Sequence, residues 1–287
     1  MTASIKVQPV YFSCAKNKGI NLVDFFSYIL DLDVLLRILT TAAIVIIVTT
    51  SVGTFGPVVG GLLAGLPIAL GPGFYFLINT VSVEFLSQTA TFSLLALSAT
   101  QAFLLTYITT ARYEFQITSL VTSVAVWVLF LAGLKQLPIT ILFASLLFAC
   151  MTCGTYLIGC RFVISKSQVR KKDGVWILVF RACVGGLIVA IVTITAPLLG
   201  GEYTGMLLAF PIFYALLSIT IHKQYGTATV INVLHSALLG TIGLAIFCIV
   251  LTVCLQSFTA ITAFFIGLLA FLVATSGMMV VATIKLA

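Results

Sequence analysis

Nine long apolar stretches, each about twenty residues or more, run through almost the whole chain and restrict what it can fold into. They lie at 34–52, 56–79, 85–111, 115–134, 138–163, 175–197, 203–222, 227–255 and 258–284. A helix needs about twenty apolar residues to cross the hydrocarbon core of a bilayer, whereas strands of a membrane barrel show alternating segments of about ten residues. The sequence therefore predicts an all-α, polytopic integral membrane protein with about nine transmembrane helices.

The scarcity of charge excludes an ordinary soluble domain. Only 7% of the residues are charged, against about a quarter in soluble proteins. The net charge of +7 is spread over loops and helix ends and forms no basic domain that could bind nucleic acid. The expected partners are membrane lipids and a small-molecule solute, with no nucleic acid.

The second half of the chain repeats part of the first half at a spacing of 144 residues. From Arg37/Arg181 to Ile68/Ile212, eleven of 32 aligned positions are identical. Roughly three or four identities are expected by chance in so apolar a chain. The aligned positions include two prolines inside apolar segments, Pro67 and Pro211. The sequence thus predicts two related halves.

The repeat and the number of segments together predict the domain organisation. Residues 1–33 are expected to form an N-terminal interfacial segment, 34–134 a first four-helix repeat, 135–174 a linker helix with a basic cytoplasmic loop, and 175–287 a second four-helix repeat. A single linker helix turns the second repeat upside down relative to the first. The predicted architecture is 4+1+4 with inverted repeats, and a homodimer is left open.

The two prolines mark the predicted centre of function. Proline has no N–H and displaces the carbonyl four residues earlier, which here belongs to Leu63 or Leu207. Broken helices at membrane depth line a cavity, meet a neighbouring helix or hold a ligand, and paired broken helices at the midplane are typical of transporter sites. Close helix packing is the alternative explanation for the glycines around Pro67.

Polar side chains inside the apolar stretches complete the predicted site. Asn232 and His235 lie on one helix face, and the repeat register pairs them with Gln88 and Thr91. His235 could carry a proton during coupling or serve only as an interhelical hydrogen-bonding group. The predicted substrate-binding set is Leu63, Pro67, Tyr75, Gln88, Thr91, Leu207, Pro211, Tyr214, Asn232 and His235. Gln101 is a secondary candidate, and Glu84, Glu202 and His222 are expected at the membrane interface.

Positive charges predict the orientation of the chain in the membrane, and two of them offer a possible contact to an anionic group. One side of the predicted membrane protein collects Arg112, Arg161, Lys166, Arg170, Lys171, Lys172, Lys223 and Lys285. The positive-inside rule makes that side cytoplasmic, together with the C-terminus, in a multi-pass cell membrane protein typical of a bacterial inner membrane. Arg37 and Arg181 begin the first helix of each repeat, where they act as snorkelling anchors or contact an anionic group.

No motif of a known enzyme class occurs in the chain. There is no HExxH, GxSxG, DDxxD or GxxxxGK[ST] pattern. The sequence predicts no catalytic residues, no metal and no cofactor, and therefore no enzyme.

The motif G-x-L-x-[GA]-[LF]-P-I occurs at 61–68 and at 205–212. With the long apolar helix that follows, it resembles the small four-helix membrane proteins of the GlpM type. The resemblance covers about three helices of each repeat and implies a four-helix ancestor that doubled and fused. It implies nothing about the substrate.

These features predict a secondary transporter that moves a small solute by alternating access, with a midplane site between two proline-broken helices. The alternatives are a channel-like pore protein, a non-transporting membrane subunit or a lipid-modifying enzyme.

Overall fold

The structure is a computed structural model that describes residues 69–113, 115–134, 136–164 and 175–284, with single helical positions at 39 and 43. The predicted interfacial segment 1–33, the apolar stretch 34–52 except for those two positions, and the basic loop 165–174 lie outside the described residues. So do Leu63 and Pro67, the side chain of Arg181, and Arg37.

The described residues are all helical apart from short connections. The helices are α5 (Leu70–Leu77), α6 (Val83–Thr110), α7 (Gln116–Leu134), α8 (Ile141–Gly159), α9 (Val175–Leu208), α10 (Ile212–Cys254) and α11 (Ala260–Ile284). Two short 3-10 helices, η1 (Ala111–Tyr113) and η2 (Cys160–Phe162), follow α6 and α8. The predicted segments 85–111, 115–134, 138–163 and 258–284 coincide within a few residues with α6, α7, α8 and α11.

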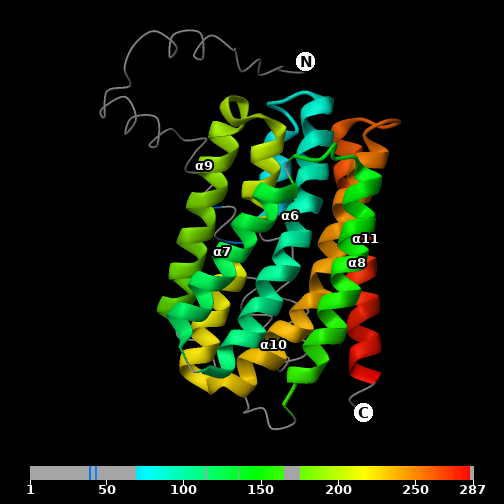
Figure 1. Cartoon of the computed structure of the whole chain (residues 1–287). Helices are drawn as coiled ribbons and strands as arrows, with labels where there is room; N and C mark the ends of the chain where they lie inside the picture. The colour runs from blue at the N-terminus through cyan, green and yellow to red at the C-terminus, as the bar shows by residue number, and fades with distance from the viewer. Residues whose placement is uncertain are drawn as a thin grey trace, which may run out of the picture.

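Two glycines bend the longest helices sharply. Gly200 in α9 and Gly226 in α10 have φ angles of 78° and 77°, a region that residues with a Cβ atom adopt only at a cost. They divide α9 into 175–199 and 201–208, and α10 into 212–225 and 227–254. Each bend reverses the chain at one end of the bundle (Figure 1).

Five helical stretches of the described residues are long and apolar enough to cross a membrane. One of them, Cys183–Cys254, is 72 residues long and contains both the bend at Gly226 and the interruption before Ile212. It therefore includes most of three predicted segments. The membrane class is confirmed at this level.

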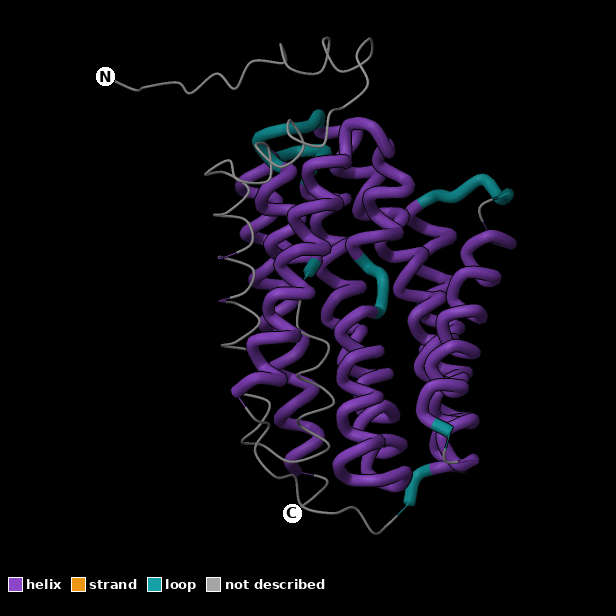
Figure 2. The backbone as a smooth tube through the Cα atoms, turned by 90° about the vertical axis from the view of Figure 1, so that its left-hand side faces the viewer, coloured by secondary structure: helices purple, strands orange, loops and turns teal. Residues whose placement is uncertain are grey.

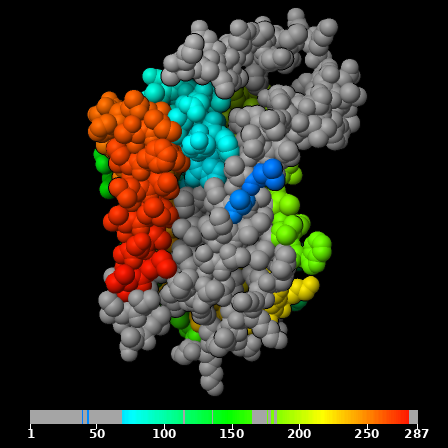
Figure 3. Space-filling model, turned by 180° about the vertical axis from the view of Figure 1, so that it is seen from behind, coloured from blue at the N-terminus to red at the C-terminus, as the bar shows by residue number. Residues whose placement is uncertain are grey.

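Helix α6 lies at the centre, where α7, α8, α9 and α10 pack against it, while α11 packs against α10 and α5. In its most apolar window 83% of the residues are buried, against 22% in α7 and α8. A helix that is apolar on all sides is typical of a buried position, whereas α7 and α8 each present an apolar face outward. Figure 3 shows α11 along one side of the molecule from one end to the other, beside the cyan segment that includes α5.

The described elements keep the repeat spacing that the sequence shows upstream of them. The second segment of α10 begins and ends 144 residues after α6, and α11 begins 144 residues after α7. In Figure 1, α6 runs away from the end at which α10 finishes, and α7 and α11 also run in opposite directions. Helices α6 and α7 are thus each antiparallel to their counterparts in the second half.

Candidate functional site

The helix interruption at Pro211 lies inside the bundle. The second segment of α9 ends at Leu208, and α10 begins at Ile212 with Pro211 in front of it. The three residues between them form the loop segment at mid-height in Figure 2. The helix is thus interrupted at this proline, while the depth of the break in a membrane stays a prediction.

The structure shows how the Leu207 carbonyl is used beside the interruption. Its carbonyl accepts a hydrogen bond from the N–H of Phe210 at 3.2 Å, and its side chain is 39% exposed. The chain tightens into a turn before the proline, so the carbonyl is used within the turn. One lone pair of this carbonyl is thus used within the turn, and its part in a binding site stays a prediction.

Side chains from the first half stabilise the interruption in the second half. The hydroxyl of Thr100, on α6, lies 3.4 Å from the carbonyl of Ala209 and also donates to Ala96 within its own helix. Trp127, on α7, donates its indole N–H to the Thr100 hydroxyl at 3.3 Å, and its ring meets Phe210 edge to face at 5.0 Å. Buried backbone groups freed by a helix break need such partners. The sequence showed no signal for this contact.

The described part of the first proline helix packs against the helix before the second break. A Cβ atom at Gly73 of α5 would contact the side chain of Leu208. The two helices thus approach each other closely next to the interruption. Pro67 lies outside the described residues, so the first break itself is not described.

The two predicted polar pairs lie at opposite ends of the bundle. Gln88 and Thr91 are near the start of α6, and Asn232 and His235 are near the start of the second segment of α10. The two helices are antiparallel, so positions matched by the repeat have equal distances from opposite ends. Only residues at the midplane can meet their counterparts. The structure therefore does not bring the two pairs into one midplane site.

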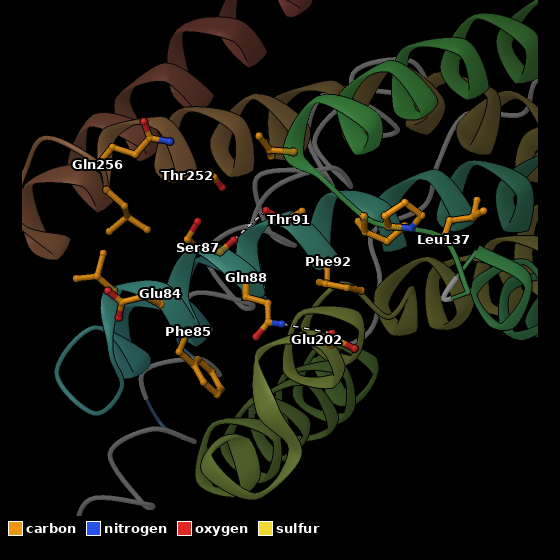
Figure 4. A pocket seen from close by; sticks show the side chains of 15 residues that line it. Glu84, Phe85, Ser87, Gln88, Thr91, Phe92, Leu137, Glu202, Thr252 and Gln256 are labelled. Carbon is orange, nitrogen blue, oxygen red and sulfur yellow. Dashed lines mark hydrogen bonds between the residues drawn. The ribbon is translucent and has the colours of Figure 1, made fainter.

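The first pair lines an open cleft of about 1030 Å³ (Figure 4). The Gln88 amide donates to the Glu202 carboxylate at 3.3 Å, and the Thr91 hydroxyl donates to the carbonyl of Ser87. The cleft lies between the start of α6, the loop before α8, the second segment of α9 and the end of α10. Its lining consists of Val83, Glu84, Phe85, Ser87, Gln88, Thr91, Phe92, Leu137, Pro138, Ile139, Ile141, Glu202, Thr252, Leu255 and Gln256.

The second pair is held by the other end of α8. Asn232 donates its amide N–H to the carbonyl of Ile164 at 2.7 Å and accepts from the Ile164 N–H at 3.1 Å. Nε2 of His235 lies 3.3 Å from the carbonyl of Tyr156 and 3.4 Å from the Cys160 sulfur. The imidazole also stacks on the Tyr156 ring at 4.6 Å. Both side chains are thus engaged by the protein itself.

The two predicted tyrosines are not among the residues that line the cleft. Tyr75 is 48% exposed and packs against Phe264 of α11. Tyr214 is 5% exposed and follows the interruption at Pro211, and its hydroxyl has no hydrogen-bond partner among the described residues. The structure therefore places neither tyrosine in the cleft.

A buried glutamine joins both halves and the linker helix. Gln101, on α6, donates its amide to the hydroxyls of Thr152 and Thr241 at 2.8 Å each and to the carbonyl of Leu238 at 3.1 Å. Its carbonyl oxygen accepts from the Thr155 hydroxyl at 3.2 Å. The sequence named Gln101 only as a secondary candidate, because its partners on α8 and α10 are ordinary threonines.

Within the described parts of the chain, no group of three His, Cys, Asp or Glu side chains is placed to hold a metal ion.

Comparison with protein-family models, with curated proteins and with solved structures finds no match. The resemblance to GlpM-type proteins therefore stays a prediction.

Proposed function

We propose that the protein is a secondary transporter that moves a small solute by alternating access. In this proposal the whole chain forms nine spans in a 4+1+4 arrangement, with the undescribed residues supplying the first span and most of the second. The antiparallel pairs α6 and α10, and α7 and α11, support inverted repeats. The interruption at Pro211 and the contact of α5 with Leu208 support a broken-helix centre.

The observation that carries the proposal is the difference between the two ends of the bundle. At one end Gln88 and Thr91 line an open cleft. At the other end the counterpart residues Asn232 and His235 are covered by Ile164 and Tyr156. An open cleft at one end and covered counterpart residues at the other, among the described residues, are what one state of an alternating-access cycle would have.

Helix α8, the unpaired linker, accounts for this difference. Its first residue, Ile141, lines the cleft, while Tyr156 and Cys160, near its other end, contact His235. A tilt of α8 relative to α10 would release one end and cover the other. We therefore assign to α8 the part that changes between the two states.

The charges support one orientation in the membrane. Arg112 and Arg161 lie where α6 and α8 finish, and Glu84 and Glu202 lie at the end that contains the cleft. The positive-inside rule then places the cleft on the outer side and the C-terminus in the cytoplasm of a cell membrane. A solute would enter this state from outside.

Side-specific thiol labelling tests the proposal without a known substrate. All seven cysteines are replaced by serine, and Ser87→Cys in the cleft is compared with Ser236→Cys, which is 8% exposed at the closed end. In sealed cells a membrane-impermeant maleimide is expected to label position 87 from outside. Position 236 is expected to react only with maleimide that is present on the cytoplasmic side, and to react slowly. Its reaction is expected to be slower still once a bulky group is attached at position 87.

Simultaneous and independent labelling of both positions from opposite sides would instead indicate a pore. Labelling of position 236 from outside would contradict the proposed orientation.

A further inference from the structure

The described charged side chains are separated between the two ends of the molecule. Glu84 and Glu202 line the cleft at one end. Arg112, Arg161 and Lys223 are all exposed and lie towards the opposite end, where α6, α8 and the first segment of α10 finish. The described residues of this opposite end therefore carry only positive side chains, and the carboxylates of the cleft lie too far away to neutralise them.

Arg112 joins two helix ends through aromatic rings. It belongs to η1, directly after α6, and its guanidinium carbon lies 5.5 Å from the centre of the Tyr113 ring. The same carbon lies 5.5 Å from the ring centre of Phe162, which belongs to η2 after α8. Cation–π contacts of this kind favour a defined position of the guanidinium. Arg161 immediately precedes Phe162, so both arginines lie where these two turns meet.

Among the described residues, the two arginines have no partner for their hydrogen-bond donors. No described residue forms a hydrogen bond or ion pair with the guanidinium of Arg112 or Arg161. A positive charge at the end of α6 or α8 is itself favoured by the helix dipole, but that effect leaves the N–H donors free. A guanidinium packed against rings keeps a planar fork that fits the paired oxygens of a phosphate.

The surroundings of the arginines indicate their depth in the membrane. Tyr113, Phe115, Val163 and Ile164 flank them and are between 41% and 69% exposed. Exposed aromatic and aliphatic side chains next to arginine, at the end of apolar helices, are typical of the boundary between hydrocarbon and headgroups. The phosphates of membrane lipids lie at this level.

We propose that Arg112, Arg161 and Phe162 form a binding site for the phosphate headgroup of an anionic membrane lipid. Arg112 binds the phosphate through its paired N–H donors, while the rings of Phe162 and Tyr113 pack against the guanidinium. Arg161 supplies the second positive charge, and the lipid chains lie along the exposed residues Val163 and Ile164. This site would keep the ends of α6 and α8 together, and it does not depend on transport.

Lipid binding to the purified full chain tests this site. Retention of phosphatidylglycerol and of phosphatidylcholine is measured by native mass spectrometry, with inorganic phosphate as a separate competitor. The unaltered chain is expected to prefer phosphatidylglycerol. Arg112→Gln and Arg161→Gln are each expected to lower that preference about fivefold, the effect of one basic residue near a charged membrane surface. Glu84→Gln, at the other end, is the matched control and is expected to change nothing.

Arg112→Lys separates a specific site from charge alone, because lysine keeps the charge but lacks the planar fork. We expect it to lose most of the preference that Arg112→Gln loses. If both arginine-to-glutamine variants keep the full preference for phosphatidylglycerol, the proposed site is wrong. If Arg112→Lys keeps the full preference, the proposed role of the planar guanidinium fork is wrong. If inorganic phosphate displaces phosphatidylglycerol at a concentration comparable to that of the lipid, the site binds phosphate and not specifically a lipid.

Discussion

At the scale of residues, the hydroxyl of Thr100 lies where three helices meet. It reaches the carbonyl of Ala209 at the helix interruption and accepts the indole N–H of Trp127. Both side chains are buried. In hydrocarbon no water can replace these partners, so the interruption depends on them.

Thr100→Val is therefore expected to destabilise the protein by about 1–2 kcal/mol, because it removes the hydroxyl that the Ala209 carbonyl and the Trp127 indole share. Thermal unfolding of the purified protein in detergent measures the change. Thr106→Val is the matched control, since the Thr106 hydroxyl bonds only to carbonyl groups of its own helix. Equal melting temperatures for the two variants would contradict the role of Thr100.

The sequence identified polar residues inside apolar stretches but not their partners. Asn232 was predicted from its spacing to His235 as a substrate contact, yet it binds the backbone of Ile164, 68 residues away. A single sequence contains no information about such a pairing. Trp127 and Thr100 were not predicted, because tryptophan and threonine are common in membrane helices for several reasons.

At the scale of elements, the second segment of α9 packs on α6 without room for a side chain. A Cβ atom at Gly205 would meet the carbonyl of Thr89 and the N–H of Ser93, both of which are backbone groups. The Ser93 hydroxyl also donates to the carbonyl of Gly205 at 3.0 Å. The helix leading to the interruption is thus fixed to the central helix at this point.

Gly205→Ala is expected to destabilise the protein by about 1–3 kcal/mol, since the backbone of α6 cannot move aside without disturbing the core. Gly154→Ala on α8 is the control, because a Cβ atom there meets nothing within 4 Å. Chemical denaturation in mixed micelles compares the two variants. A stability of Gly205→Ala equal to that of Gly154→Ala would show that the two helices are not in close contact.

The length of apolar stretches predicted most of the helices, because the bilayer sets that length. The ends of α6, α7, α8 and α11 lie within a few residues of the prediction. The midplane site could not be predicted as well. Gln88 was paired with Asn232 from the sequence register alone. In an inverted repeat, however, two matched residues lie at equal distances from opposite ends of the bundle. Most of the bundle therefore separates Gln88 from Asn232.

At the scale of the whole molecule, helix α8 is the unpaired helix of the proposed 4+1+4 arrangement and breaks the symmetry of the two proposed halves. It touches the cleft with one end and covers His235 with the other. Between these ends, Thr152 and Thr155 bond to Gln101 at the centre. Fixed contacts at the centre and different contacts at the two ends are what a rocking motion requires.

The most direct test is a pair of distance distributions measured by spin labelling and pulsed electron resonance in lipid. One pair of labels, at Leu137 and Gln256, spans the cleft, and another, at Val163 and Gln224, lies at the closed end; all four positions are exposed. Alternating access predicts two populations for each pair, with a long distance across one end accompanied by a short distance across the other when conditions shift the balance. A single unchanging distance for both pairs, or simultaneous lengthening at both ends, would contradict the account.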